Sequence, residues 1–207
     1  MKNLFIAFEG IDGSGKSTQV RNVARYLESL GHNIYITCEP TDNPIGKMIR
    51  DIFNHRMEAD QRVIAALFVA DRLHHLLQAG EGILRKMEEG FTVLTDRYYF
   101  SSYAYHTVHN IDLEWVIDAN SLSAQLLKPD VNIYLDMPPE KSMERILKGR
   151  QHVEMYETLE NQMQVYSQYE AAFTRLATEE TILRINADQP EEKVGSDILQ
   201  ALKTYLG

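Results

Sequence analysis

A glycine-rich segment near the start of the chain has the residue types that bind the phosphates of a nucleotide. Residues 10–17 read GIDGSGKS and satisfy the pattern Gly-x4-Gly-Lys-Ser/Thr. They stand between an apolar run at 4–8 and an amphipathic stretch that begins at Lys16, which is the strand–loop–helix context of a P-loop. Glycines let successive backbone N–H groups turn toward phosphates at the positive end of the helix. The segment therefore predicts nucleotide binding, the alternative being a glycine turn that caps an ordinary helix.

Side chains in this segment, and others at the end of a later apolar run, suit a phosphate chain. In a P-loop, Lys16 would reach the β- and γ-phosphates and the Ser17 hydroxyl would coordinate Mg²⁺. Asp96 and Arg97 close the apolar run at 92–95, and ligands bind beyond the carboxyl ends of parallel strands. We therefore expect Asp96 to help hold the Mg²⁺ hydration shell and Arg97 to bind a phosphate with its planar guanidinium. The alternative is a structural ion pair between Asp96 and Arg97.

Short apolar runs alternate with long amphipathic ones along the chain, as in βαβ units on a parallel sheet. The apolar runs are nearly continuous, as expected for strands that helices cover on both faces. We expect strands at 3–8, 33–37, 91–95, 131–136 and 181–185. We expect helices at 16–30, 44–54, 60–78, 80–89, 98–108, 112–127, 139–148, 157–178 and 190–205. The prediction is one α/β domain over residues 1–207, a P-loop NTPase fold with a five-stranded parallel sheet, helices on both faces and a lid at about 148–158.

Composition limits the class of partner. Lys+Arg 21 against Asp+Glu 30 gives a formal net charge of −9, which argues against a nucleic-acid groove. A phosphorylated small molecule is compatible, because a few local arginines can outweigh the global field. Cys38 is the only cysteine, so no intramolecular disulfide can form and nothing indicates an oxidising compartment. The apolar run at 4–8 is too short for a membrane span and has no cleavage signature, so we expect a soluble, cytoplasmic protein that binds neither nucleic acid nor membrane.

Several motifs together resemble those of the thymidylate kinase family over essentially the whole chain. In order they are FEGIDGSGKSTQ at 8–19, EP at 39–40, LFVADR at 67–72, DRY at 96–98 with SS at 101–102 and AY at 104–105, KPD at 128–130, YLD at 134–136 and NAD at 186–188. The resemblance implies a nucleoside monophosphate kinase that transfers the γ-phosphoryl group of ATP to dTMP with Mg²⁺, giving dTDP and ADP in dTTP synthesis. It also implies a homodimer, which surplus apolar surface on the helices at 60–78 and 98–127 favours. ATP would be held by Gly10, Asp12, Gly13, Ser14, Gly15, Lys16, Ser17 and Thr18.

The resemblance also assigns the residues that bind the sugar and the base of dTMP. In the family, the residue that matches Asp12 hydrogen-bonds the sugar 3′-hydroxyl, which explains an acidic residue in a phosphate loop; the alternative is helix capping. Phe68 and Arg72 lie four apart on an expected helix and so share a face. The matching Phe stacks on thymine and the matching Arg hydrogen-bonds its carbonyl edge, whereas the alternative for Phe68 is core packing. The aromatic ring that matches Tyr105 occupies the space of a ribose 2′-hydroxyl and thereby selects deoxynucleotides.

Weaker contacts complete this implied acceptor pocket. Ser101 and Ser102 would line it with polar groups, and Arg97 would hold the dTMP phosphate. Arg50 would be a further arginine near that phosphate, the alternative being an exposed helix charge. The implied metal contacts are those of Ser17 and Asp96.

Phosphoryl transfer places charge on three equatorial oxygens, so catalysis is mainly positioning and electrostatic stabilisation. Some thymidylate kinases carry a basic residue within the P-loop, where this chain has Gly13 and Ser14. We therefore expect Arg150, in the lid, to supply the missing charge, with Arg145 as a second candidate and a solvated lid charge as the alternative. A charge restored at Gly13 should then partly replace that of Arg150. The expected catalytic residues are Lys16, Arg97 and Arg150.

The chain departs from the family pattern at three places. Cys38 replaces an arginine at the end of the second strand, His106 replaces a common glutamine, and Met155 replaces the arginine before the lid carboxylate Glu157. The P-loop, base and sugar residues are intact, so the reaction class stands. The departures bear on lid mechanics and on how strictly the base is chosen.

Three rival hypotheses remain. A deoxynucleoside kinase would need a carboxylate base to deprotonate a 5′-hydroxyl, and Glu9 is the candidate; another nucleoside monophosphate kinase of the P-loop class would not. A regulatory P-loop protein would bind nucleotide without an acceptor pocket. A metal site could be built from His74, His75, His106 and His109, but these have no accompanying cysteine and no zinc-site spacing.

Overall fold

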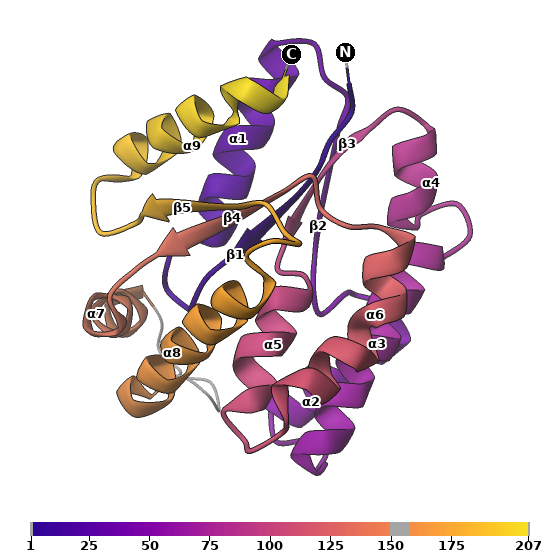
Figure 1. Cartoon of the computed structure of the whole chain (residues 1–207), viewed down its shortest axis with the longest axis vertical. Coiled ribbons are helices and arrows are strands. Elements are labelled where there is room, and N and C mark those ends of the chain that lie inside the picture. Colours follow the sequence, from indigo (N-terminus) through magenta and orange to yellow (C-terminus); the bar gives the residue numbers. More distant parts are fainter. Residues whose placement is uncertain (1, 150–157, 207) are drawn as a thin grey trace.

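The computed structural model describes residues 2–149 and 158–206, and its centre is a five-stranded sheet in the order β2-β3-β1-β4-β5. All neighbouring strands are parallel, as expected from the sequence. The strands are β1 (Phe5–Glu9), β2 (Ile34–Cys38), β3 (Thr92–Asp96), β4 (Val131–Asp136) and β5 (Ile182–Asn186). The strand before the P-loop is thus the central one, with β3 and β4 on its two sides (Figure 1). Both phosphate-binding segments predicted from the sequence begin at adjacent strand ends.

Helices cover both faces of this sheet, which explains why its central strands are buried along almost their whole length. In Figure 1, α1 and α9 lie on one face, while α5 and α8 lie on the other with α6, α3 and α2 outside them. Every residue of β1 is buried, as a parallel strand covered on both faces requires. The described helices are α1 (Lys16–Ser29), α2 (Pro44–Phe53), α3 (Gln61–Leu77), α4 (Ile83–Glu88), α5 (Tyr99–Thr107), α6 (Leu113–Leu126), α7 (Pro139–Gly149), α8 (Leu159–Leu176) and α9 (Glu191–Leu206).

Several helices begin one or two residues later than the sequence predicted, because capping residues precede them. Asp60 accepts a hydrogen bond from the backbone N–H of Arg62, and Asp112 accepts one from that of Trp115. Such caps have extended backbone angles and lie outside the helix proper. The helix expected at 80–89 is only α4, since Gly80 has a left-handed backbone and Gly82 stands at the cap.

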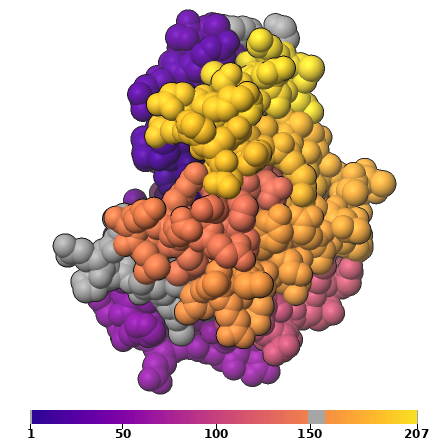
Figure 2. Space-filling model, turned by 90° about the vertical axis from the view of Figure 1, so that its left-hand side faces the viewer, coloured from indigo at the N-terminus to yellow at the C-terminus, as the bar shows by residue number. Residues whose placement is uncertain are grey.

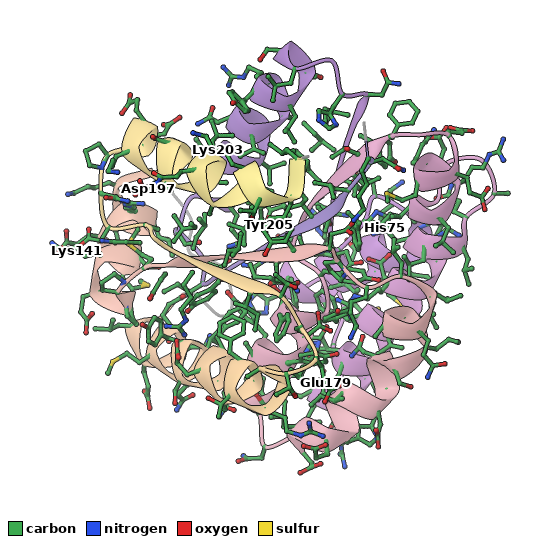
Figure 3. The ribbon with its side chains drawn as sticks, turned by 45° about the horizontal axis from the view of Figure 1, so that its top comes forward. His75, Lys141, Glu179, Asp197, Lys203 and Tyr205 are labelled. Atoms are coloured by element: carbon green, nitrogen blue, oxygen red, sulfur yellow. The ribbon has the colours of Figure 1, made fainter. Side chains whose placement is uncertain are left out.

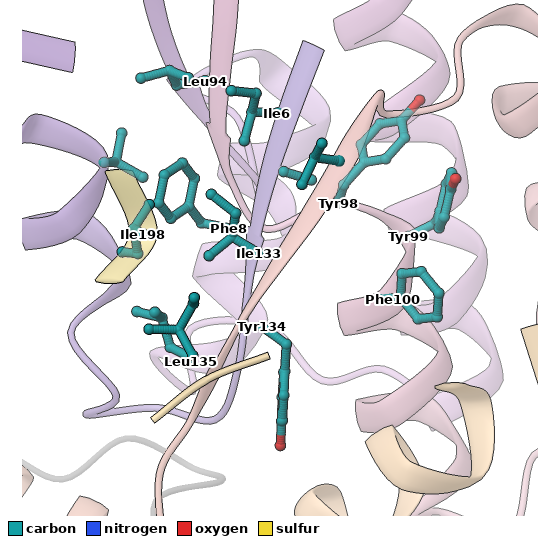
Figure 4. Packing of buried hydrophobic residues seen from close by; sticks show 14 of the residues in the cluster. Ile6, Phe8, Leu94, Tyr98, Tyr99, Phe100, Ile133, Tyr134, Leu135 and Ile198 are labelled. Carbon is teal, nitrogen blue, oxygen red and sulfur yellow. The ribbon is translucent and has the colours of Figure 1, made fainter. Parts of the chain in front are cut away.

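The core lies on both sides of the sheet. Figure 4 shows Phe8 next to Ile198 of α9, Leu94 beside Ile6, and Tyr98 with Phe100 on the opposite side. The ring of Phe5 meets that of Tyr98 edge to face, with centroids 5.1 Å apart. This packing fixes the strands whose ends carry the site residues.

Helices α7, α8 and α9 form the surface at one end of the molecule, seen face-on in Figure 2. The lid predicted at about 148–158 falls largely outside the described residues. Among the described helices, none combines the length and the apolar character needed to cross a membrane.

Candidate active site

The P-loop has backbone angles that side chains disfavour, at the glycines that the motif specifies. Gly10, Gly13 and Gly15 have φ of 142°, 75° and 96°, all in the region that favours glycine. A Cβ at Gly10 would stand 2.9 Å from the carbonyl oxygen of Leu135, so the loop also passes β4 too closely for a side chain. Ser14 is buried, and Thr18 lies in the first turn of α1.

Gly13 is covered by α7, and this corrects one expectation. A Cβ there would lie 2.8 Å from the carbonyl oxygen of Ser142 and 2.9 Å from Ile146 Cγ1, while the Ser142 hydroxyl donates to the Asp12 carbonyl. The expectation that a charge restored at Gly13 could replace that of Arg150 is therefore wrong for this chain. A long basic side chain would meet both a left-handed backbone and the body of a helix.

Lys16 is folded back on its own loop. Its Nζ donates to the carbonyl oxygens of Gly10 at 3.0 Å and Ile11 at 2.9 Å, and the residue is 6 % exposed. Burial, with the nearby Arg97 charge, lowers the pKa of the Lys16 ammonium to about 8. The ammonium is therefore within the loop that would hold the phosphates, with backbone carbonyls as its partners.

Ser17 and Asp96 are brought together, as the sequence predicted. The Ser17 hydroxyl donates to Asp96 Oδ2, which joins the first turn of α1 to the end of β3. A hydroxyl and a carboxylate are hard oxygen donors, and Mg²⁺ is commonly held by one carboxylate together with waters and substrate phosphates. Cys38 pairs with Asp96 in the strand register, and burial, with the Asp96 charge, raises the pKa of its thiol. The position that usually carries an arginine is thus neutral in this chain.

Arg97 connects the P-loop to the predicted acceptor pocket. Its guanidinium donates to Asp12 Oδ1, to the Gly10 carbonyl at 3.2 Å, to Ser101 Oγ at 2.9 Å and to Tyr105 Oη at 3.2 Å. Arg97 also has φ of 73°, which a non-glycine residue adopts at a cost of about 1–3 kcal/mol. The surrounding contacts hold it there. The predicted alternative, an ion pair of Arg97 with Asp96, gives way to one with Asp12.

Asp12 faces the same pocket and is held as an anion. Its carboxylate accepts from Arg97 and, at 2.8 Å, from the Tyr105 hydroxyl. Burial alone would raise the pKa of this carboxyl, but the Arg97 and Lys16 charges outweigh it and hold the pKa below its ordinary value. Its side chain is 26 % exposed, so the anion can reach a ligand hydroxyl.

Glu9 is a structural junction beneath the loop. One carboxylate oxygen accepts the backbone N–H of Tyr98 at 2.8 Å, and the other accepts the hydroxyls of Ser101 at 2.6 Å and Tyr169 at 3.0 Å. Burial raises the pKa of the Glu9 carboxyl against these hydrogen bonds. Glu9 is fully buried and both its oxygens are engaged, which leaves the deoxynucleoside kinase hypothesis without its candidate base.

A cavity of about 290 Å³ lies next to the P-loop. Phe68 forms part of its wall and packs against the ring of Phe53, with centroids 6.0 Å apart, and that of His106, 5.1 Å apart. Arg50 lies on the same wall and donates to the Pro40 carbonyl. The lining residues are Asp12, Pro40, Arg50, Phe53, Asn54, Ile64, Phe68, Arg97, Ser101, Ser102, Tyr105 and His106. The predicted acceptor residues therefore converge on one cavity, with Arg72 as the exception.

Arg72 lies behind the cavity wall and not on it. The side chain is 1 % exposed and forms an ion pair with Glu39, Nη2 to Oε2, at 2.6 Å. Its Nη1 donates to Ser102 Oγ at 3.1 Å and to Asn120. In this structure Arg72 therefore reaches the cavity through Ser102, and its direct contact with a base stays a prediction.

The lid candidates divide between described and undescribed parts of the chain. Arg150, Met155 and Glu157 lie outside the described residues. Arg145 donates to the carbonyl oxygen of Ala187 at 3.0 Å, and this contact joins α7 to the loop after β5. Arg145, the second candidate for the missing charge, thus already has a partner on that loop.

The predicted rival metal site does not form in the described part of the chain. No cluster of three or more His, Cys, Asp or Glu residues suited to a metal ion occurs there. His75 instead contacts Glu39 and Thr37. Burial lowers the pKa of His106 to about 3, so it is neutral beside Phe68.

Some contributors had no distinctive sequence signal. Glu39 was recognised only as part of a motif, and its contact with Arg72 spans 33 residues. In the sequence, Tyr169 of α8 and Asn120 of α6 look like ordinary helix positions. In the structure, Tyr169 contacts Glu9 and Asn120 contacts Arg72. Tertiary contacts of this kind follow from how α6 and α8 pack, which periodicity does not specify.

Comparisons with known proteins agree with this arrangement. The family model for thymidylate kinase matches residues 8–198. The chain is 36 % identical over 218 residues to the probable thymidylate kinase of Thermococcus kodakarensis, covering 99 % of each chain. It is 37 % identical over 212 residues to that of Pyrococcus horikoshii, covering 100 % of this chain and 98 % of the relative. The thymidylate kinase of Thermoanaerobacter sp. is 33 % identical over 209 residues, covering 100 % of both. Matches of this length and identity mean that the chain belongs to the thymidylate kinase family.

Proposed function

We propose that this protein transfers the γ-phosphoryl group of ATP to dTMP and forms dTDP and ADP. The observation that carries the proposal is the cavity in which Asp12, Arg97 and Tyr105 meet, next to the P-loop. A regulatory P-loop protein needs no such pocket. The family membership points to the same reaction.

The acceptor brings its own nucleophile, so the chain needs to supply position and charge. A phosphate oxygen of the monophosphate is already anionic, and no side chain has to deprotonate it. Arg97 presents its planar guanidinium beside the P-loop carbonyl of Gly10 and can bind the acceptor phosphate in a bidentate manner. Lys16 would leave the carbonyls of Gly10 and Ile11 to reach the β- and γ-phosphates.

Ser17 and Asp96 are the residues that would hold Mg²⁺, since their oxygens already meet at the start of α1. When bound there, the ion would supply positive charge that neutralises the charge developing on the phosphates. The thiol of Cys38 nearby is neutral and supplies no positive charge. Among the described residues, Lys16 and Arg97 would therefore neutralise the phosphate charge. Arg150 is the residue proposed to supply further positive charge from the lid.

Sugar selection would rest on Asp12 and Tyr105. The Tyr105 hydroxyl donates to Asp12, and Arg97 lies over the Tyr105 ring, 4.8 Å from its centroid. These contacts hold the Tyr105 ring where the 2′-hydroxyl of a ribonucleotide would project. The exposed part of the Asp12 carboxylate would accept a hydrogen bond from the sugar 3′-hydroxyl. Phe68 offers its face to the base.

Homodimerisation is proposed on an apolar surface of α3 and α6, which pack against each other. Exposed large apolar side chains on these two helices are Val63, Leu77, Trp115 and Leu122. Burial of these side chains against a second copy would remove apolar area from water, which favours a dimer. Sedimentation equilibrium at micromolar concentration should give a dimer; a monomer would remove this part of the proposal. The cytoplasmic location and the lack of nucleic-acid binding stay predictions.

An ADP-release assay over a panel of acceptors tests the proposed reaction. The panel is dTMP, dUMP, dCMP, UMP, the ribose form of TMP, thymidine and deoxycytidine, each with ATP and Mg²⁺. We expect dTMP to react fastest, dUMP more slowly, and the ribose forms to be rejected. Faster reaction of thymidine than of dTMP would contradict the proposal, because it would require a base that Glu9 does not provide.

A further inference from the structure

A chain of hydrogen bonds, buried beyond its partly buried first link at Thr37, runs from β2 to the wall of the acceptor cavity. It begins at Thr37 Oγ1, which lies 2.6 Å from His75 Nε2, and His75 Nδ1 lies 3.1 Å from Glu39 Oε1. Glu39 Oε2 then pairs with Arg72, and Arg72 Nη1 reaches Ser102 Oγ at 3.1 Å. Ser102 lines the cavity. Figure 3 labels His75 on the side of the molecule that carries α3, far from Lys141 and Asp197.

The direction of hydrogen bonding along this chain is set by the chemistry of its members. An ionised carboxylate only accepts and a guanidinium only donates, so Glu39 accepts from both His75 and Arg72. His75 therefore carries a proton on Nδ1, and Ser102 Oγ accepts from Arg72 at the far end. With a lone pair of Ser102 occupied in this way, its own hydrogen is available to donate into the cavity.

His75 is what holds the Glu39 carboxylate in place. Arg72 Nε and Nη2 both bind one oxygen of Glu39, at 2.9 and 2.6 Å, while the other oxygen has His75 as its partner. Glu39 and Arg72 side chains are both 1 % exposed, so no bulk water can substitute for a lost partner. A carboxylate freed from His75 could rotate about its last bond and take the guanidinium with it.

We propose that His75 is a positioning residue for base selection: through Glu39 it holds Arg72 so that the cavity wall at Ser102 presents hydrogen-bond donors. A donor wall matches the carbonyl oxygens of thymine or uracil and opposes the exocyclic amino group of cytosine. The inference rests on the proposed function, since it concerns the base edge of a pyrimidine monophosphate. It assigns a role in that reaction to residues that do not line the cavity.

Two substitutions of similar size separate the contacts of His75. In His75→Asn the amide nitrogen replaces Nδ1 and keeps the bond to Glu39. In His75→Gln the amide oxygen takes the place of Nε2, where it can accept from the Thr37 hydroxyl, and the bond to Glu39 is lost. The readout is the ratio of kcat/KM for dTMP to kcat/KM for dCMP, measured with saturating ATP. His74→Gln is the matched control, since this neighbour on α3 does not contact Glu39.

We expect His75→Gln to lower this ratio about tenfold, mainly through a higher KM for dTMP. His75→Asn and His74→Gln should stay within about threefold of the parent ratio. Equal ratios for the Asn and Gln variants would overturn the inference. So would a His75→Gln variant that slows dTMP and dCMP by the same factor, because a purely structural role predicts that result.

Ser102→Ala tests the last link without touching the buried charges, and it keeps the inference testable if the His75 variants do not fold. It should lower the dTMP-to-dCMP ratio about tenfold, and an unchanged ratio would overturn the inference. If the parent protein phosphorylates dTMP but the variants keep its dTMP-to-dCMP ratio, the inference is overturned and the proposed function stands. A parent protein with no activity on dTMP overturns the proposed function itself.

Discussion

The two nucleotide sides of this site hold their cations in different ways. On the acceptor side, Arg97 and Arg72 are paired with the carboxylates of Asp12 and Glu39. On the donor side, the hydrogen-bond partners of the Lys16 ammonium among the described residues are carbonyl oxygens of its own loop. A guanidinium paired with a buried carboxylate is already oriented, whereas an ammonium on backbone carbonyls has to exchange its partners for phosphate oxygens. We therefore expect dTMP to find its proposed pocket largely preformed, and ATP to complete the arrangement of its own side.

Replacing Lys16 should have the largest effect. We expect Lys16→Ala to lower turnover by roughly 10³-fold or more, because no other described cation lies within the phosphate loop. Steady-state ADP release at saturating dTMP measures it. Lys16→Arg, which keeps a charge but not its compact shape, serves as the comparison. Activity within tenfold of the parent in Lys16→Ala would mean that the donor side does not depend on this ammonium.

Arg150 tests whether the donor side draws charge from the lid. We expect Arg150→Ala to lower turnover at least about 100-fold, with turnover and kcat/KM falling equally, because the contact would form only in the transition state. ATP binding, measured by calorimetry, should change little. Lys141→Ala is the matched control on α7, because this exposed side chain pairs with Glu144. A loss of less than about threefold would make Arg150 a solvated charge and return attention to Arg145 and Lys148.

Arg97 tests the acceptor side. Hydrogen bonds to charged groups contribute about 1.5–3 kcal/mol each, so Arg97→Ala should lower kcat/KM for dTMP about 10- to 100-fold. Most of this loss should appear as a higher KM for dTMP, with KM for ATP nearly constant. Arg97→Lys should have a kcat/KM for dTMP between those of the parent and of Arg97→Ala. If KM for both nucleotides rose by the same factor, the acceptor and donor roles would not be separable at this residue.

The pH dependence of nucleotide binding should differ between the donor and acceptor sides. This is the smallest of the expected effects. The pKa of Lys16 is about 8 in the ligand-free chain, and bound phosphates favour its charged form. Above pH 8 the binding of ATP requires Lys16 to take up a proton from solvent. The Kd for ATP should therefore rise about tenfold between pH 7 and pH 9. Burial would lower the pKa of Arg97, but neighbouring anions hold it well above its ordinary value, so this residue gives dTMP binding no such dependence. Calorimetry in two buffers of different ionisation enthalpy measures the proton uptake, and a pH-independent Kd for ATP would contradict the interpretation of Lys16.

The sequence predicted most of the fold because local signals agreed with one another. Buried apolar runs, amphipathic stretches and the glycines at 10, 13 and 15 each specified an element, and the parallel sheet follows from the alternation of these runs. It also predicted which side chains meet at the strand ends, since Asp96 is the last residue of β3 and Arg97 directly follows it. It did not predict that Arg97 pairs with Asp12 instead of Asp96, because that choice depends on a left-handed backbone angle at Arg97.

Other parts of the site depend on packing that periodicity cannot specify. The position of Arg72 behind the cavity wall follows from Glu39 and Asn120, which approach it from β2 and α6. The closure of α7 over Gly13 is a contact between segments about 130 residues apart, at Asp12 and Ser142. Sequence motifs named the residues of the P-loop but not the space around them.

The contact of Asp12 with Arg97 and Tyr105 has a thermodynamic consequence. Asp12 belongs to the P-loop, where we propose that ATP binds, and with Arg97 and Tyr105 it lines the proposed dTMP cavity. A dTMP molecule that binds Arg97 and Asp12 would compete with the contact between them, and the resulting change at the P-loop would alter the free energy with which ATP binds. Linkage requires that coupling to be reciprocal: the factor by which ATP changes the affinity for dTMP equals the factor by which dTMP changes the affinity for ATP.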